Sequence, residues 1–178
     1  MNTWFERLKG EMDDAISGMS NQQLEFAPAG KWNTARILEH LALAFGGTAK
    51  AFEKQLASDA TPSPRAPTLY ERVGTIVVTR LNYFPGGRKA PDGVVPTGVD
   101  AETSVRSFHE NLERMDRSLA VAEQRWGNVD RVAVHPVLGP LTLPEWRKFH
   151  YMHTRHHVKQ VKALKLTQII TAKLASKA

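Results

Sequence analysis

The chain lacks cysteine altogether, which excludes disulfide bonds, cysteine-ligated metal sites and a cysteine nucleophile. It also lacks any apolar run close to the roughly 20 residues that span a bilayer. Residues 1–19 carry acidic side chains and no apolar stretch of the kind that a secretory signal has. We therefore expect a cytoplasmic protein with no membrane partner, and any thiol used in its chemistry would have to come from a substrate.

The composition is that of an ordinary globular domain. The 178 residues are 42% hydrophobic and 24% charged, which is enough to bury a core without covalent staples, and residues 1–178 are expected to form one domain. The formal net charge of +6 permits anionic partners. No nucleic-acid-binding motif and no basic face with aromatic platforms accompanies this charge, so we expect no nucleic-acid partner.

Helical spacing is the dominant pattern along the chain. Apolar residues recur at intervals of three and four in four long stretches, which predicts helices over residues 3–19, 34–57 and 101–125 and from Thr142 to about Lys165. A capping residue stands at the start of each helix: Asn2, Asn33, Asp100 and Thr142. The fold class expected is all-α, an antiparallel-type four-helix bundle in which the roughly 50 residues between the second and third long helices leave room for a crossover.

The segments outside the long helices are less regular. Leu69, Val73 and Ile76 predict a short extra helix over 69–83, although the β-branched run within it also fits a strand. Residues 85–99 contain three prolines and four glycines and are expected to form a long loop, a candidate lid or rim. His135 to Pro140 is predicted to be a turn, and the tail after about residue 166 is expected to pack loosely.

Histidines carry the chemistry that the sequence suggests. Four of the seven lie between His150 and His157, and a helical projection places His153 and His157 one turn apart on the apolar side. Two imidazoles at this spacing can bind one divalent ion. His40, at the edge of the apolar side of the second long helix, is the best candidate for a third ligand. Three protein ligands leave open coordination positions, which is typical of catalytic metal sites.

Other interpretations of the same residues remain open. An isolated H-x-x-x-H pair also occurs as hydrogen-bonded core histidines. His150 flanks the predicted metal side and is expected to be a surface or supporting group. His156, Glu39 and Gln160 are candidates for assisting the chemistry, as a base, as a group that orients a ligand, or as a substrate contact.

Two histidine segments resemble a known family. Residues 32–41, with Trp32 and His40, resemble the W-x-x-x-x-(L/V)-x-H-L segment of the DinB/YfiT-like metalloenzymes, and residues 153–160 resemble their H-x-x-x-H-x-x-Q helix. Residues 135–142 with Glu145 and Trp146 resemble a DinB-related bacterial subgroup with the signature HPxxGxLT…EW…H. The resemblance implies a DinB-type bundle, in many members a homodimer, with His40, His153 and His157 as a metal triad for zinc or nickel. It also implies activity toward thiols, since characterised relatives are thiol S-transferases and a thiol-dependent isomerase.

Together these observations predict a divalent-metal-dependent enzyme that acts on a small molecule. The bound ion would activate either a low-molecular-weight thiol, in an S-transferase, or water, in a hydrolase. The alternative is a helical bundle that binds a metal or ligand without catalysis. A third possibility is a plain helical domain with core histidines.

Overall fold

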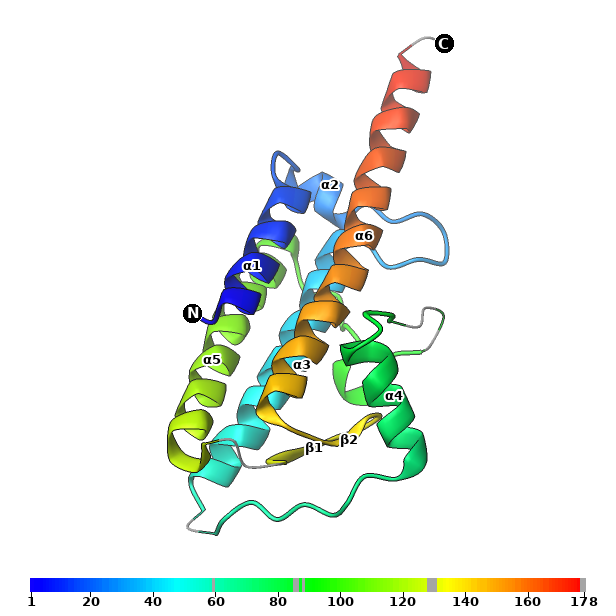
Figure 1. The fold of residues 1–178 in the computed structure, drawn as a ribbon. Coiled ribbons are helices and arrows are strands. Elements are labelled where there is room, and N and C mark those ends of the chain that lie inside the picture. The colour runs from blue at the N-terminus through cyan, green and yellow to red at the C-terminus, as the bar shows by residue number, and fades with distance from the viewer. Residues whose placement is uncertain (59, 85–86, 88, 128–130, 177–178) are drawn as a thin grey trace.

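The computed structural model describes residues 1–58, 60–84, 87, 89–127 and 131–176, and these residues are mostly helical (Figure 1). The predominantly helical class expected from the sequence is therefore confirmed. The helices are listed here with their bounds: α1 (Thr3–Ile16), α2 (Asn21–Glu25), α3 (Thr34–Leu56), α4 (Leu69–Thr79), η1 (Asp92–Val94, a 3-10 turn), α5 (Ala101–Trp126) and α6 (Leu143–Ala175). None of the helices among these residues is long and apolar enough to cross a membrane.

Helices α3 and α5 lie against each other and run in the same direction. Phe45 packs on Phe108 near the middle of the pair, and Glu53 bonds Arg114 further along both helices. Parallel neighbours cannot be joined by a tight turn, so the connection from α3 to α5 returns along the length of the helices. Residues 57–100 form this crossover.

Helices α1 and α6 form the second parallel pair. The rings of Trp4 and Tyr151 lie 4.7 Å apart, and Lys165 Nζ donates to the carbonyl oxygen of Ala15. This pair runs opposite to α3 and α5 (Figure 1). Large side chains from all four helices fill the space between them, and the burial of each contributes about 1.5–3 kcal/mol. They include Phe5, Leu8, Met12, Leu38, Leu41, Phe45, Phe52, Phe108, Leu112, Met115, Leu119 and Val161.

The first and last helices differ in length from the prediction. Helix α1 ends at Ile16 rather than at residue 19, because Gly18 takes a left-handed backbone conformation with φ 72°. Ser20 and Gln23 then form a capping box that starts α2, a helix that the sequence analysis missed. Helix α6 continues ten residues past Lys165 to Ala175, and its last turns extend beyond the other helices (Figure 1).

The segment from Leu69 to Thr79 is helical, so the strand alternative is wrong. Thr68 and Glu71 form a capping box that starts α4. The turn predicted within residues 135–140 is confirmed at 136–138, and it joins two short strands that were not predicted: β1 (Ala133–His135) pairs antiparallel with β2 (Gly139–Leu141). Gly139 sits at φ 71°, and the Glu71 carboxylate lies where a side chain at this position would be.

Glu39 ties the crossover to α3. The carboxylate accepts hydrogen bonds from the Thr97 amide (2.8 Å) and hydroxyl (2.7 Å) and from the Gly98 and Val99 amides (2.8 and 3.3 Å). Burial alone would raise the pKa of Glu39, but these hydrogen bonds outweigh it and lower the pKa. Of the predicted 85–99 loop, residues 85, 86 and 88 lie outside the described residues, and the remainder contains η1.

Replacing Glu39 with Gln should destabilise the fold. Glutamine carries no negative charge, and its amide nitrogen cannot accept hydrogen bonds from residues 97–99. We therefore expect a loss of about 1.5–3 kcal/mol in the free energy of unfolding. Urea denaturation at pH 7 measures this loss. Glu113→Gln on exposed α5 surface is the control, expected to cost less than about 0.5 kcal/mol. Equal effects from the two variants would contradict an anchoring role for Glu39.

Candidate metal centre

Three imidazoles meet inside the helices, one from α3 and two from α6. His153 Nε2 lies 3.1 Å from His40 Nε2 and 3.1 Å from His157 Nε2. All three side chains are buried, and their ligand atoms lie within 4.8 Å of one another. The structure therefore brings together the three residues that the sequence analysis selected as ligands, in a cluster that could hold a metal ion.

Hydrogen bonds at the far sides of two rings determine which nitrogen faces the cluster. His40 Nδ1 lies 2.7 Å from the carbonyl oxygen of Val94, which only accepts, so Nδ1 carries the proton and Nε2 presents a lone pair. The amide nitrogen of Gln160 donates to His156 Nε2 at 3.2 Å. That orients the Gln160 oxygen toward His157 Nδ1 at 2.8 Å, so His157 also turns an unprotonated Nε2 inward.

The resulting cluster is short of protons. Of the three nitrogens that face one another, His40 Nε2 and His157 Nε2 are unprotonated, and His153 Nε2 can donate to only one of them. Two nitrogens bound tetrahedrally to one zinc-like ion are about 3.3 Å apart, close to the 3.1 Å found here. A cation between the rings would satisfy all three lone pairs at once, which a shared proton cannot do.

Aromatic rings enclose His153. Phe84 and Phe149 both stack on the imidazole, with centroids at 5.0 and 5.5 Å and interplanar angles of 24° and 22°. Trp32 lies beside His40, with ring centroids 5.2 Å apart. These rings remove water from the cluster, and Nδ1 of His153 is buried without a hydrogen-bond partner among the described residues.

Burial keeps the histidines neutral. It lowers the pKa of His157 to about 3, and it drives the pKa of His153 well below its usual range, with the neighbouring His157 and His40 adding to the effect. Burial also lowers the pKa of His40, although its hydrogen bond to Val94 opposes the shift. His150 is lowered to about 3 and His135 to about 4 for the same reason. Neutral imidazoles are the form that binds metals.

The other candidates from the sequence lie around the cluster rather than in it. Gln160 and His156 form the chain of hydrogen bonds behind His157. Both carboxylate oxygens of Glu39 accept from residues 97–99, so this side chain faces the crossover. His150, expected to be a surface or supporting group, is buried and lies 2.9 Å from the Thr48 hydroxyl through Nε2.

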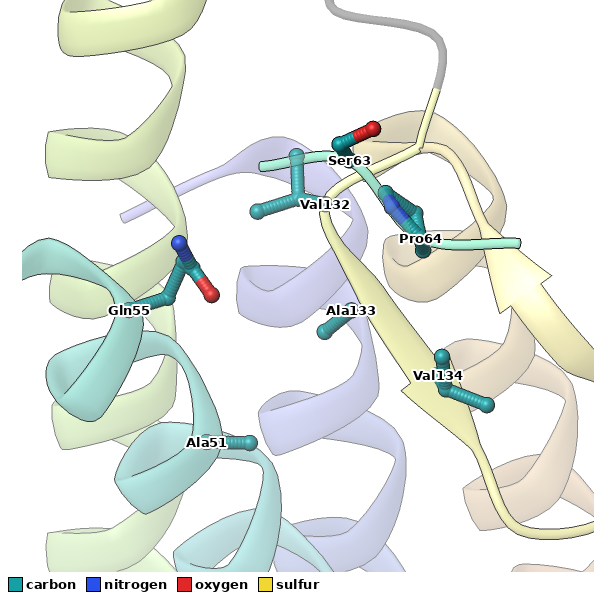
Figure 2. A pocket seen from close by; sticks show the side chains of 7 residues that line it. All are labelled: Ala51, Gln55, Ser63, Pro64, Val132, Ala133 and Val134. Carbon is teal, nitrogen blue, oxygen red and sulfur yellow. The ribbon is translucent and has the colours of Figure 1, made fainter. Parts of the chain in front are cut away.

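A cleft of about 340 Å³ lies at the other end of α3 (Figure 2). Ala51 and Gln55 of α3, Ser63, Pro64 and residues 132–134 line it. Ala51 is 11 residues beyond His40, about 16 Å along a helix, so this cleft is separate from the histidine cluster. Its lining contains no titratable side chain, and we assign no chemistry to it.

Two parts of the site escaped the sequence analysis. The carbonyl of Val94 acts through the backbone, which every residue has, so no sequence signal marks it. Phe84 lies in an irregular segment after α4, where helical spacing says nothing about its direction. The partners that orient and enclose the ligands were therefore harder to predict than the ligands.

The fold and this cluster define a helical protein with three buried histidines that could bind a metal. The chain belongs to DUF1569, a family described as proteins of unknown function, whose family model matches residues 5–163. It is similar to the uncharacterised protein YuaE of Bacillus subtilis (strain 168), with 26% identity over 162 residues, covering 90% of this chain and 94% of that protein. No solved structure matches the chain.

The neutral buried histidines should make the metal-free fold sensitive to acid. Their pKa values lie below the roughly 6.5 of an unfolded chain, so the unfolded state binds more protons and stability falls as the pH drops below about 6.5. Between pH 7 and pH 5 each strongly shifted histidine should cost about 2 kcal/mol of unfolding free energy. Urea denaturation in the presence of a chelator measures this dependence.

His150→Leu provides the comparison for this test. The variant lacks one buried group whose pKa is about 3, so its stability should fall by about 2 kcal/mol less over the same interval. Between pH 7 and pH 8 the two proteins should show the same small dependence. An unchanged acid dependence in the variant would mean that His150 does not resist protonation in the fold.

Proposed function

We propose that this protein is a cytoplasmic, divalent-metal-dependent enzyme whose ligands are His40, His153 and His157. The observation that carries the proposal is the 3.1 Å approach of ring nitrogens whose lone pairs outnumber the protons available to them. Zinc or nickel suits three imidazole nitrogens. The substrate in this proposal is a small molecule, because the three ligand side chains are buried and a macromolecule would not reach them.

The residues around the cluster have distinct parts in this proposal. His40, His153 and His157 would hold a divalent ion with coordination positions left over, and such an ion would supply a nucleophile near neutral pH by lowering the pKa of a bound thiol or water. The carbonyl of Val94 and the amide of Gln160 orient His40 and His157. Phe84 and Phe149 exclude water around His153. His156, whose Nε2 accepts from Gln160, supports the orientation of the amide.

The arrangement of the helices supports a DinB-type bundle. The long crossover that joins the parallel helices α3 and α5 agrees with the bundle that the resemblance of the histidine segments implies. The same resemblance favours a low-molecular-weight thiol over water as the molecule activated, which makes an S-transferase the first candidate and a hydrolase the second. The proposal competes with a non-catalytic metal-binding bundle.

Metal content tests the site directly. Protein purified without a histidine tag and dialysed should retain about one equivalent of divalent metal, and His153→Ala should retain almost none, because two imidazoles bind far more weakly than three. Elemental analysis measures both. His109→Ala is the matched control, since His109 lies on α5 beside Asp13. Equal metal content in the wild type and His153→Ala, or no metal in either protein, would contradict the proposed metal centre.

Turnover distinguishes an enzyme from a binding protein. With a low-molecular-weight thiol and a chlorobimane probe, we expect conjugation that a chelator abolishes and added zinc or nickel restores. The sulfur forms a bond to the probe as chloride leaves, so fluorescence reports the rate. If several thiols and hydrolysable esters give no turnover while metal stays bound, the protein is a metal-binding bundle without this activity.

A further inference from the structure

Positive charge is concentrated in the last fifth of the chain. Residues 146–178 hold eight of the 24 Lys and Arg side chains and none of the 18 Asp and Glu side chains. The first 145 residues therefore have a formal net charge of −2, although the whole chain has +6. Most of the basic segment belongs to α6, so the excess positive charge lies on one helix.

The cations of α6 that lie beside other helices are neutralised. Arg147 pairs with Glu123 of α5 at 2.8 Å, and Arg155 pairs with Glu11 of α1 at 3.3 Å. Further along α6, three exposed cations have no carboxylate partner among the described residues: Lys159, Lys162 and Lys173. These three charges are available to a partner outside the chain.

Large apolar side chains stand among these lysines. Four of them are 42–66% exposed: Leu166, Ile169, Ile170 and Leu174. The positions 159, 162, 166, 169 and 173 follow one another at steps of three and four, which places them on one side of the helix. We call the three lysines and the four apolar residues together the α6 end surface.

The other helices leave the α6 end surface uncovered. The last turns of α6 extend beyond them (Figure 1). On the opposite side of α6, Leu164 is buried, and Gln168 Nε2 donates to the carbonyl oxygen of Gln23 in α2. Because that side contacts the rest of the protein, the α6 end surface faces outward.

Helix α4 exposes a second apolar side. Its covered side contacts the hairpin, where the Thr75 hydroxyl donates to the carbonyl oxygen of Leu138. Val73, on the opposite side, is 53% exposed. Residues 69–83 have a formal charge of +1, whereas residues 159–174 have +4 and no acidic side chain. The α6 end surface is therefore the more strongly basic of the two.

The mixture of charge and apolar area favours a negatively charged lipid surface as the partner. Lysine ammonium groups on long stems reach phosphate groups, while leucine and isoleucine side chains enter the layer between the head groups. A second copy of this chain would be repelled by the same lysines. A nucleic acid would leave the apolar side chains in water, and a folded protein would need a groove that matches a projecting helix. A fluid lipid surface needs no such groove.

We propose that the α6 end surface binds the surface of an anionic lipid membrane. The helix would lie on the head groups, since no helix among the described residues is long and apolar enough to cross a membrane. The expectation of no membrane partner rests on the lack of a spanning run, and binding at the surface requires none. The inference depends on α6 alone and not on the proposed function.

Binding of the full chain to vesicles tests the proposal. We expect the protein to sediment with vesicles of equal parts phosphatidylglycerol and phosphatidylcholine, and to stay in solution with phosphatidylcholine alone. Raising the salt concentration should release it, because screening weakens the attraction between the lysines and the lipid surface. No binding to the anionic vesicles at low salt, or equal binding to both compositions, would overturn the proposal.

Two substitutions separate the charged and apolar contributions. Lys162→Gln should weaken binding to the anionic vesicles about fivefold and Ile170→Ser about tenfold, because each removes one kind of contact with the lipid. Arg117→Gln and Val121→Ser on exposed positions of α5 are the matched controls and should bind like the wild type. Circular dichroism and metal content should be the same in all four variants.

The pattern of losses identifies both the surface and its ligand. Unchanged binding by Ile170→Ser together with weaker binding by Lys162→Gln would mean that the lysines bind any polyanion, which would overturn the proposal. Weaker binding by Val73→Ser than by Ile170→Ser would overturn it in favour of α4.

A fluorescent label supplies a measurement that does not depend on weakening the contact. The chain has no cysteine, so a polarity-sensitive dye on Leu174→Cys is unique, and its emission should shift to the blue when anionic vesicles are added. The same dye on Val121→Cys should not shift. Equal shifts at the two positions, or no shift at Leu174→Cys while the protein sediments with the vesicles, would contradict contact through the α6 end surface.

Discussion

The attachment of the crossover to α3 is the interaction on which the candidate metal centre depends. His40 and Glu39 are neighbours in the sequence, and both bind residues 94–99: His40 through Nδ1 to the Val94 carbonyl, Glu39 through four hydrogen bonds. The first bond sets which nitrogen of His40 faces His153. The hydrogen bonds of Glu39 hold in place the segment that contains the Val94 carbonyl. The parallel arrangement of α3 and α5 makes this possible, because it requires a long connection that can return over α3.

The ligands themselves could be predicted from the sequence because helical periodicity determines them. His153 and His157 are one turn apart on a predicted helix, and His40 lies in a helix with a clear cap at Asn33. The same periodicity located the four long helices to within a few residues at most of their ends. The start of α2 is also marked in the sequence, because Ser20 and Gln23 have the four-residue spacing of a capping box.

Other features depend on contacts that periodicity does not describe. The stripe on α4 has the spacing of a buried face, yet the hairpin covers the opposite side, where Thr75 and Gly74 allow close packing. Helix α6 continues past Lys165 because nothing in its sequence breaks a helix, although the core ends there. In both cases the local pattern gives the type of element, and only the tertiary arrangement decides which side is covered.

Burial affects the histidine cluster in two opposing ways. It removes the imidazoles from water and keeps them neutral, which leaves lone pairs that repel one another across 3.1 Å. The same neutrality and proximity give the cluster its affinity for a cation, because no proton has to be displaced from His40 or His157 before binding. A cation that binds only the folded state stabilises that state by mass action. The arrangement that is unfavourable for the metal-free fold is thus the one that would couple metal binding to its stability.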